Sequence, residues 1–277
     1  MPIQELLTGV TFPSPTINVN TIPNPLTYLG SQLQLWLEAN AGITNDGTGA
    51  AAYDGDGNVS AWADQSGNGR NLVQYQSNPI PPFVASAQNG LPGVQSNASA
   101  NATCPYLRSA YASGLDFAAS TPFSVFLAFK PGTSGDNIMG TYYSSAQGWY
   151  VSLVAGKPAL RICNSATVQC AASGSSALTL GTPYIVQLVN TGTGTAAGLQ
   201  IYVNNVLQTN TVIIDNLAGA VTQNGTYGVA APAIFSGNSS YESRATILEM
   251  GVASKAFSAH DAAIIDAYLN AKWAIHA

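Results

Sequence analysis

The chain has 277 residues, of which only 8% are charged, and its formal net charge is −5. Its eight Lys and Arg residues are scattered singly, so no basic stripe exists that could neutralise the phosphates of nucleic acid or anionic lipid. No apolar run reaches the ~20 residues that a bilayer-spanning helix needs. We therefore expect neither nucleic acid nor a membrane as a direct partner. The neutral polar surface suits contacts with proteins or uncharged glycans.

The first 30 residues are expected to form an extended arm that attaches to a partner subunit. Five prolines interrupt this Thr- and Asn-rich stretch: Pro2, Pro13, Pro15, Pro23 and Pro25. Proline at this density disfavours helices and central strands, and such a segment becomes ordered mainly against another molecule. The start, residues 1–5, lacks the basic residues of a secretion signal, so synthesis in the cytoplasm without a cleaved signal is expected.

Residues 31–277 are predicted to form one sandwich of β-strands. Strands are expected at Leu33–Leu37, Val59–Ala63, Asn71–Tyr75, Pro105–Arg108, Phe123–Phe129, Asn137–Tyr143, Trp149–Val154, Tyr184–Val189, Leu199–Val203, Tyr227–Ala230 and Ala245–Val252. The clearest is Phe123–Phe129, where alternate apolar side chains predict one buried face. The pair Asn204-Asn205 suits a two-residue hairpin turn, because Asn tolerates positive φ. Roughly a dozen short strands with turns between them indicate two packed antiparallel sheets.

One helix is predicted at the end of the chain, over residues 258–274. Ser258 is expected as its N-cap, and Asp261, three residues later, completes a capping-box pattern. Its apolar face should pack on the sandwich and consists of Ile264, Ile265, Tyr268, Leu269 and Trp273.

The three cysteines, Cys104, Cys163 and Cys170, are an odd number, which excludes a complete disulfide framework. Cys163 and Cys170 stand on the two arms of an expected hairpin, so a disulfide between them is one interpretation. The alternative, which we favour, is that all three are small buried or half-buried thiols.

Three segments together resemble the concanavalin A-like, laminin-G-like jelly-roll domains of bacterial surface proteins and tailed-phage virion proteins. They are Leu35–Ala39, Val59–Asn71, and the pair formed by Glu249–Val252 and Ala267–Trp273. The resemblance implies a structural role for the middle segment: Trp62 on a strand, followed by a tight turn. In that turn Asp64, Ser66 and Asn68 should bond the backbone, while Gly67 and Gly69 supply positive φ.

The resemblance leaves the activity open, because this fold includes lectins, adhesion modules, polysaccharide-degrading enzymes and passive virion components. Enzymes of the fold that cleave polysaccharides carry paired carboxylates in a Glu-x-Asp-x-x-Glu motif or a close variant. None of the four glutamates stands in such a motif: Glu5, Glu38, Glu242 and Glu249. Glu249 is expected to satisfy backbone or hydroxyl groups, and no enzymatic activity is expected.

Two candidate binding features remain. Asp54, Asp56 and Asn58 alternate and could offer three oxygen ligands to calcium, but the segment lacks a distal bidentate Glu, and a Gly-rich turn is the favoured alternative. No other cofactor is expected. For glycan stacking the candidates are Tyr143, Trp149, Tyr150 and Tyr241; of Trp149 and Tyr150, adjacent on a strand, one ring must face inward.

These observations favour a non-enzymatic virion structural protein, a capsid decoration or a tail or baseplate component. Its lectin-like sandwich would be displayed on the extracellular particle, anchored to other virion proteins through residues 1–30, and homo-oligomeric. The alternative is a carbohydrate-binding adhesin module that recognises a cell-surface polysaccharide. A polysaccharide hydrolase or lyase ranks third, because the carboxylate motif is missing.

Overall fold

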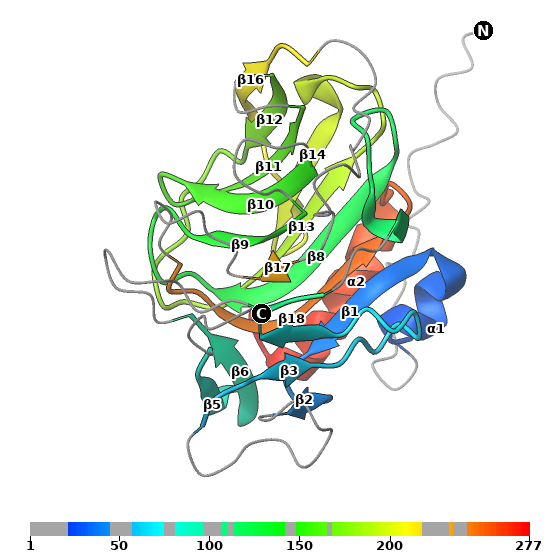
Figure 1. Ribbon diagram of the computed structural model, residues 1–277. Helices are drawn as coiled ribbons and strands as arrows, with labels where there is room; N and C mark the ends of the chain where they lie inside the picture. The colour runs from blue at the N-terminus through cyan, green and yellow to red at the C-terminus, as the bar shows by residue number, and fades with distance from the viewer. Residues whose placement is uncertain are drawn as a thin grey trace, which may run out of the picture.

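The computed structural model describes residues 22–44, 57–74, 81–96, 107–109, 113–141, 148–164, 168–217, 233–234 and 243–277. Within these residues the fold is a sandwich of two antiparallel sheets with a C-terminal helix packed on one of them (Figure 1). This confirms the all-β jelly-roll sandwich expected from the strand pattern.

Eight of the described strands form the first sheet. Its order is β15 (Val206–Leu207), β14 (Leu199–Val203), β13 (Tyr184–Asn190), β8 (Phe123–Lys130), β18 (Thr246–Ala253), β6 (Leu91–Gln95) and β5 (Phe83–Gln88), with β1 (Leu33–Glu38) also paired to β18. Strand β18 therefore joins the beginning of the fold to its end. It pairs with β8 on one side, and with β6 and β1 in succession on the other.

The other ten described strands form the second sheet. Its order is β16 (Thr211–Asp215), β12 (Gln169–Ser173), β11 (Lys157–Cys163), β10 (Gly148–Val154), β9 (Asn137–Gly140), β17 (Ala233–Ile234), β7 (Leu107–Arg108), β4 (Leu72–Gln74), β3 (Ala61–Trp62) and β2 (Ile43–Thr44). Three 3₁₀ turns connect described elements at Gly30–Gln32, Ser113–Leu115 and Ala196–Gly198.

Aromatic rings fill the space between the two sheets. The ring of Phe123 in β8 stacks on Phe117 with 4.6 Å between centroids, and lies 5.4 Å from the ring of Trp149 in β10. The Trp149 indole donates a hydrogen bond to the Leu115 carbonyl at 2.9 Å, so its polar atom is satisfied inside the core. The alternation read at Phe123–Phe129 thus does mark a face turned toward the core.

The opposite face of β8 is buried too, which differs from the expected pattern of one buried face. Helix α2 (Ala259–Trp273) covers it: the Gln187 amide of β13 donates to the Ala262 carbonyl at 2.9 Å. The ring of Phe126 also lies 6.3 Å from that of Phe257, just before the helix. Because the sheet lies between a second sheet and a helix, its central strand is apolar on both sides.

The start of α2 has the predicted capping box. The Ser258 hydroxyl accepts from the Asp261 amide, and the Asp261 carboxylate accepts from the Ser258 amide at 2.8 Å. Asp261 also accepts from the Tyr28 hydroxyl at 2.8 Å and binds the Lys255 ammonium at 2.9 Å. Burial alone would raise the pKa of Asp261, but the hydrogen bonds from Lys255, Ser258 and Tyr28 hold it below its usual range.

The predicted extended arm is wrong for its last residues. Helix α1 (Pro25–Leu29) follows Asn24, whose side chain caps it by accepting from the Thr27 amide at 2.8 Å. Pro25 stands at the first helical position, where a missing N–H costs nothing, so this proline starts a helix instead of preventing one. Leu29 is buried, and Tyr28 bonds α2 as described above, so this part belongs to the body of the fold. Residues 1–21 lie outside the described part of the chain.

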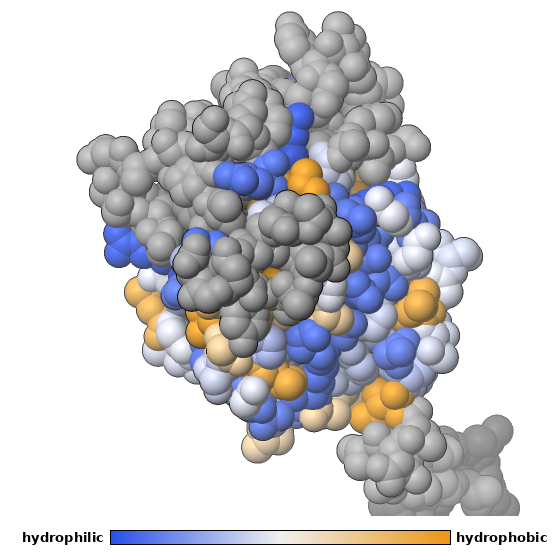
Figure 2. All heavy atoms as spheres, turned by 60° about the horizontal axis from the view of Figure 1, so that its bottom comes forward, coloured by the Kyte–Doolittle hydropathy of each residue, from blue (hydrophilic) through white to orange (hydrophobic). Residues whose placement is uncertain are grey.

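The two-residue hairpin predicted at Asn204-Asn205 joins β14 to β15. Both residues have positive φ, 48° and 60°, and Val203 pairs with Val206 across the turn. Figure 2 shows that apolar residues on the visible described surface form small separate groups among hydrophilic ones. Of the helices in the described ranges, none combines the length and hydropathy of a membrane span.

Candidate functional site

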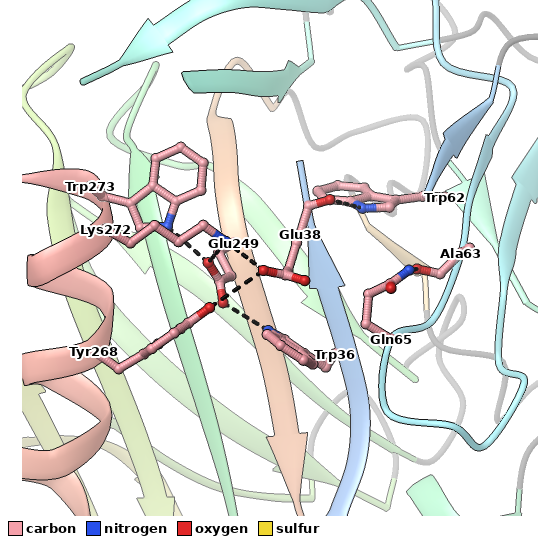
Figure 3. Close-up of polar contacts among 9 residues, drawn as sticks. All are labelled: Trp36, Glu38, Trp62, Ala63, Gln65, Glu249, Tyr268, Lys272 and Trp273. Carbon is pink, nitrogen blue, oxygen red and sulfur yellow. Dashed lines mark hydrogen bonds and ion pairs between the residues drawn. The ribbon is translucent and has the colours of Figure 1, made fainter. Parts of the chain in front are cut away.

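The strongest polar constellation in the described chain joins β1, β18 and α2. The strand register places Glu38 directly opposite Glu249, and the Lys272 ammonium contacts both carboxylates, at 2.5 Å and 2.7 Å (Figure 3). We call Glu38, Glu249 and Lys272, with the side chains that bond them, the carboxylate cluster. It unites the first strand, the last strand and the last helix of the fold.

Aromatic N–H and O–H groups complete the carboxylate cluster. Glu249 accepts from the indole of Trp36 at 2.7 Å on one oxygen, and from the indole of Trp273 at 2.9 Å on the other (Figure 3). The Tyr268 hydroxyl donates to Glu38 at 3.4 Å. Glu249 is fully buried, and this burial raises its pKa, an effect that Lys272 opposes. Burial and the neighbouring carboxylates also raise the pKa of Tyr268.

This geometry does not suit glycosidic bond cleavage. A glycosidase needs two carboxyl groups that reach one bond from opposite sides, with space between them for the sugar. Here the ammonium of Lys272 occupies the space between the carboxylates, and both oxygens of Glu249 are engaged inside the core. The cluster instead fastens three distant segments. Glu249 is expected from the sequence to meet backbone or hydroxyl groups; the Tyr268 hydroxyl does bond it, but its other partners are two indoles and an ammonium.

The turn after Trp62 has the geometry that the sequence suggested. One oxygen of Asp64 accepts from the amides of Trp36 and Ser66, and the other accepts from the Ser66 hydroxyl and the Arg70 amide, all at 2.8–3.0 Å. The side-chain amide of Asn68 donates to the Leu33 carbonyl at 2.9 Å.

Two further features complete this turn. Gly67 and Gly69 have φ of 85° and 69°, and the Trp62 indole donates to the Glu38 carbonyl at 2.9 Å. Gln65, in the same turn, donates to the Ala63 carbonyl (Figure 3). The turn therefore holds β1 from the side opposite the carboxylate cluster, and its role is structural.

A second group of polar residues lies on the face of the second sheet that points away from the core. Along β10, β11 and β12 the side chains alternate, so that Trp149, Ile162 and Cys170 enter the core. The opposite face, which we call the outer face, carries Tyr150, Ser152, Ala159, Arg161, Cys163, Gln169, Ala171 and Ser173.

On the outer face Tyr150 and Arg161 are direct cross-strand partners, and both are half-buried. The Arg161 guanidinium carbon lies 5.7 Å from the centroid of the Tyr150 ring. One Arg161 nitrogen donates to the Gln169 side chain at 3.3 Å. An aromatic ring and a cation thus stand side by side.

Of the four predicted stacking residues, Tyr150 lies half-buried on the outer face, where its neighbours Ser152 and Ala171 are buried. Trp149 is completely buried, so its proposed contact with a glycan is wrong: the strand turns this ring into the core and Tyr150 outward. Tyr143 and Tyr241 lie outside the described residues. Sequence reasoning missed Arg161. Alternation along the strand turns Tyr150 outward, but its cross-strand partner Arg161 can be identified only when the strand register is known.

The proposed calcium ligands fall mostly outside the described part of the chain. Asp54 and Asp56 are not among the described residues, while Asn58 forms an isolated bridge with Pro82. Among the residues that are described, no group of three or more His, Cys, Asp or Glu side chains could hold a metal. Calcium binding stays a prediction.

The disulfide between Cys163 and Cys170 is wrong. Both are free and buried, because the hairpin register pairs Cys163 with Gln169 and Cys170 with Ile162. The two cysteines therefore stand one position apart in register and point to opposite faces of the sheet. Burial raises the pKa of each thiol to about 12. Cys104 lies outside the described residues.

Comparison with known proteins shows similarity at the level of the fold. No family profile matches the sequence, and no curated protein matches it either. Among solved structures, one of botulinum neurotoxin type C, whose cell entry depends on interaction with two ganglioside molecules, aligns with a TM-score of 0.54 and 11% identity, covering 87% of this chain and 52% of that one.

Two further solved structures are binding domains of toxins. That of Paraclostridial Mosquitocidal Protein 1 aligns with a TM-score of 0.53 and 14% identity over 74% of this chain and 49% of that one. That of botulinum neurotoxin DC, in complex with rat synaptotagmin II, aligns with a TM-score of 0.51 and 12% identity over 86% and 52%. The chain thus spans about half the length of the structures it matches. At these identities the likeness shows the shared sandwich fold alone.

Proposed function

We propose that this chain is a non-enzymatic recognition module whose β-sandwich binds a glycan or receptor at a surface. The observation that carries the proposal is the Tyr150–Arg161 pair on the outer face, half-buried and side by side on paired strands. An aromatic ring next to hydrogen-bonding groups is the arrangement that sugar recognition uses, because the ring packs on the apolar face of a sugar while polar groups bind its oxygens.

The carboxylate cluster supports the non-enzymatic part of the proposal. Among the described residues the fold brings the carboxylates of Glu38 and Glu249 together, yet Lys272 bridges them and Glu249 is fully buried. The similarity to toxin structures supports a binding role, since two of them are binding domains and one toxin interacts with gangliosides. A sandwich of this kind serves many functions, so the proposed binding role depends on the residues of the outer face and not on the fold.

The finer proposal is that the module is displayed on a virion, as a capsid decoration or a tail or baseplate component. It is supported by the sequence resemblance to jelly-roll domains of tailed-phage virion proteins and by the low charge of the chain. In this scheme residues 1–21 attach to another virion protein, while residues 22–32 belong to the body, as the α1 contacts with Asp261 indicate.

The test of the recognition function is binding of the purified chain to cells and to a glycan array. Binding that Tyr150→Ala weakens at least tenfold, while Tyr184→Ala leaves it intact, is the expected result; Tyr184 is a half-buried tyrosine on the other sheet. Absence of binding to every cell and glycan would contradict the proposal. Release of reducing sugar that vanishes in Glu249→Gln would show an enzyme instead.

The virion role needs a separate test. Deleting residues 1–21 should leave a folded sandwich that no longer joins the particle, whereas normal assembly of the truncated chain would contradict the arm assignment. Circular dichroism and thermal unfolding of the truncated chain serve as the control for folding.

A further inference from the structure

Arg161 differs from Lys255 and Lys272 in having no carboxylate partner among the described residues. Lys272 binds Glu38 and Glu249, and Lys255 binds Asp261. Arg161 forms no ion pair with any carboxylate that the structure describes; its contacts are the neutral side chains of Gln169 and Tyr150. A half-buried guanidinium without a counter-charge is unusual, because burial removes the water that would otherwise stabilise it.

One donor of this guanidinium is also unsatisfied. Among the residues that the structure describes, the buried Nε of Arg161 has no hydrogen-bond partner, whereas one terminal nitrogen bonds Gln169 at 3.3 Å. Buried donors in folded proteins nearly always have a partner, so an orphan of this kind calls for an explanation. A ligand that supplies the missing acceptor would explain it. Nε and a terminal nitrogen together form one side of the guanidinium fork, and this side matches a carboxylate.

The surroundings of Arg161 on the outer face are small. Its cross-strand partner on β12 is Ala171, and the partner of Tyr150 on β9 is Gly140. A Cβ on Gly140 would lie 2.5 Å from the Tyr150 Cβ, so the tyrosine needs glycine beside it. Between Gly140 and Ala171 the ring and the guanidinium are the two large groups of this row, and Ile214 of β16 follows beyond Ala171.

We propose that Arg161 and Tyr150 bind the carboxylate-bearing ring of an acidic saccharide, a uronic acid or a sialic acid. The proposal rests on the recognition function above and deepens it by naming the class of ligand. The carboxylate accepts from the free side of the Arg161 guanidinium, and the apolar face of the same sugar packs on the Tyr150 ring. One arginine whose described contacts are neutral suits one carboxylate, and the net charge of −5 opposes a dense polyanion.

This inference departs from the expectation of uncharged glycans that composition suggested. Composition counts cations and does not show which of them are already paired. Lys255 and Lys272 bind carboxylates, whereas the described contacts of the Arg161 guanidinium are neutral, so the local chemistry at Arg161 decides.

The experiment measures affinity by titration calorimetry for three probes: sialyllactose, tri-galacturonate and lactose. At least one acidic probe should bind the wild-type chain more tightly than lactose, and which one binds distinguishes the two sources of the carboxylate. Arg161→Gln should weaken that binding at least tenfold, as expected for loss of a hydrogen bond to a charged group. Arg161→Lys should restore only part of it, because an ammonium lacks the planar fork.

Lys157→Gln is the matched control, since Lys157 lies on the same strand and the same face but four positions away. This substitution also removes one positive charge, and the affinity for the acidic saccharide should stay within twofold of wild type. Equal losses in Arg161→Gln and Lys157→Gln would overturn the proposal, as would sodium acetate competing as well as the saccharide. Thermal unfolding of each variant shows whether it is folded.

Failure of this inference and failure of the proposed function have different outcomes. Binding to cells or neutral glycans with unchanged affinity in Arg161→Gln would overturn the acidic saccharide and leave the recognition function intact. Lack of binding to any glycan or cell would overturn both.

Discussion

Glu38 and Glu249 face each other across the antiparallel pair of β1 and β18, and the ammonium of Lys272 contacts both. Like charges directly opposite in a sheet repel each other, so this pairing depends on the cation. Since Lys272 comes from the last helix, the charge balance of the sheet is completed only when α2 has docked.

Replacing Lys272 by Met should therefore destabilise the protein strongly. Two carboxylates would remain without a counter-charge, and removal of one partner of a buried ion pair costs about 3–5 kcal/mol. Urea unfolding followed by tryptophan fluorescence measures the change. Lys157→Met is the control, and a loss under 1 kcal/mol for Lys272→Met would mean that the carboxylates are protonated or solvated without it.

The turn after Trp62 gives a second prediction. Asp64→Ala removes the acceptor for the amides of Trp36, Ser66 and Arg70, and the first two of these bonds are buried. Leaving buried donors unsatisfied costs about 1–3 kcal/mol for each group, so we expect the midpoint of urea unfolding to fall clearly. Asp215→Ala, at a more exposed carboxylate, serves as comparison. Equal stability of Asp64→Ala and wild type would show that water replaces the carboxylate.

Acid sensitivity should depend on Asp261. Its pKa is held below the ordinary value of 3.8, so the folded state favours the charged carboxylate. The sign follows from linkage: the stability that this group supplies is present above pH 3.8 and is lost as the pH falls through the lowered folded pKa. Unfolding free energies of wild type and Asp261→Asn, measured from neutral to acidic pH, should converge as the pH falls. A constant difference would contradict this assignment.

The thiols of Cys163 and Cys170 should be inert in the folded protein. Both are buried, and burial raises the pKa of each to about 12, so almost no thiolate is present at neutral pH. In a Cys104→Ser background, a thiol reagent such as Ellman's should find no reactive group before unfolding and two afterwards, without reductant. If the two thiols of the unfolded protein reacted only after reduction, Cys163 and Cys170 would be joined by a disulfide.

The fold could be predicted from the sequence to a large extent because its signals are local. Alternation at residues 123–129, the Asn204-Asn205 turn and the Ser258–Asp261 capping box each depend on neighbours within a few positions, and all three are present. The local rule failed at Pro25, where the same residue type that breaks a helix from within begins one at its first position.

The candidate sites could not be predicted in the same way. Trp36, Glu249 and Lys272 all stand in segments that carry the family resemblance, yet nothing in those segments shows that they meet. The contact of Trp36 with Glu249 joins residues 213 positions apart in the sequence. Likewise, a shift of one position in the register of β11 and β12 would have brought the two cysteines opposite each other.

By itself, therefore, the sequence determined the β-rich architecture, the C-terminal helix and the turn geometry, because backbone preferences and hydrophobic periodicity act over a few residues. Only the tertiary structure decided which carboxylates share Lys272, which aromatic ring faces outward and which arginine has no carboxylate partner among the described residues. Those properties depend on strand register and on the order of strands in the sheets, which bring distant residues together and leave no periodic trace in the chain.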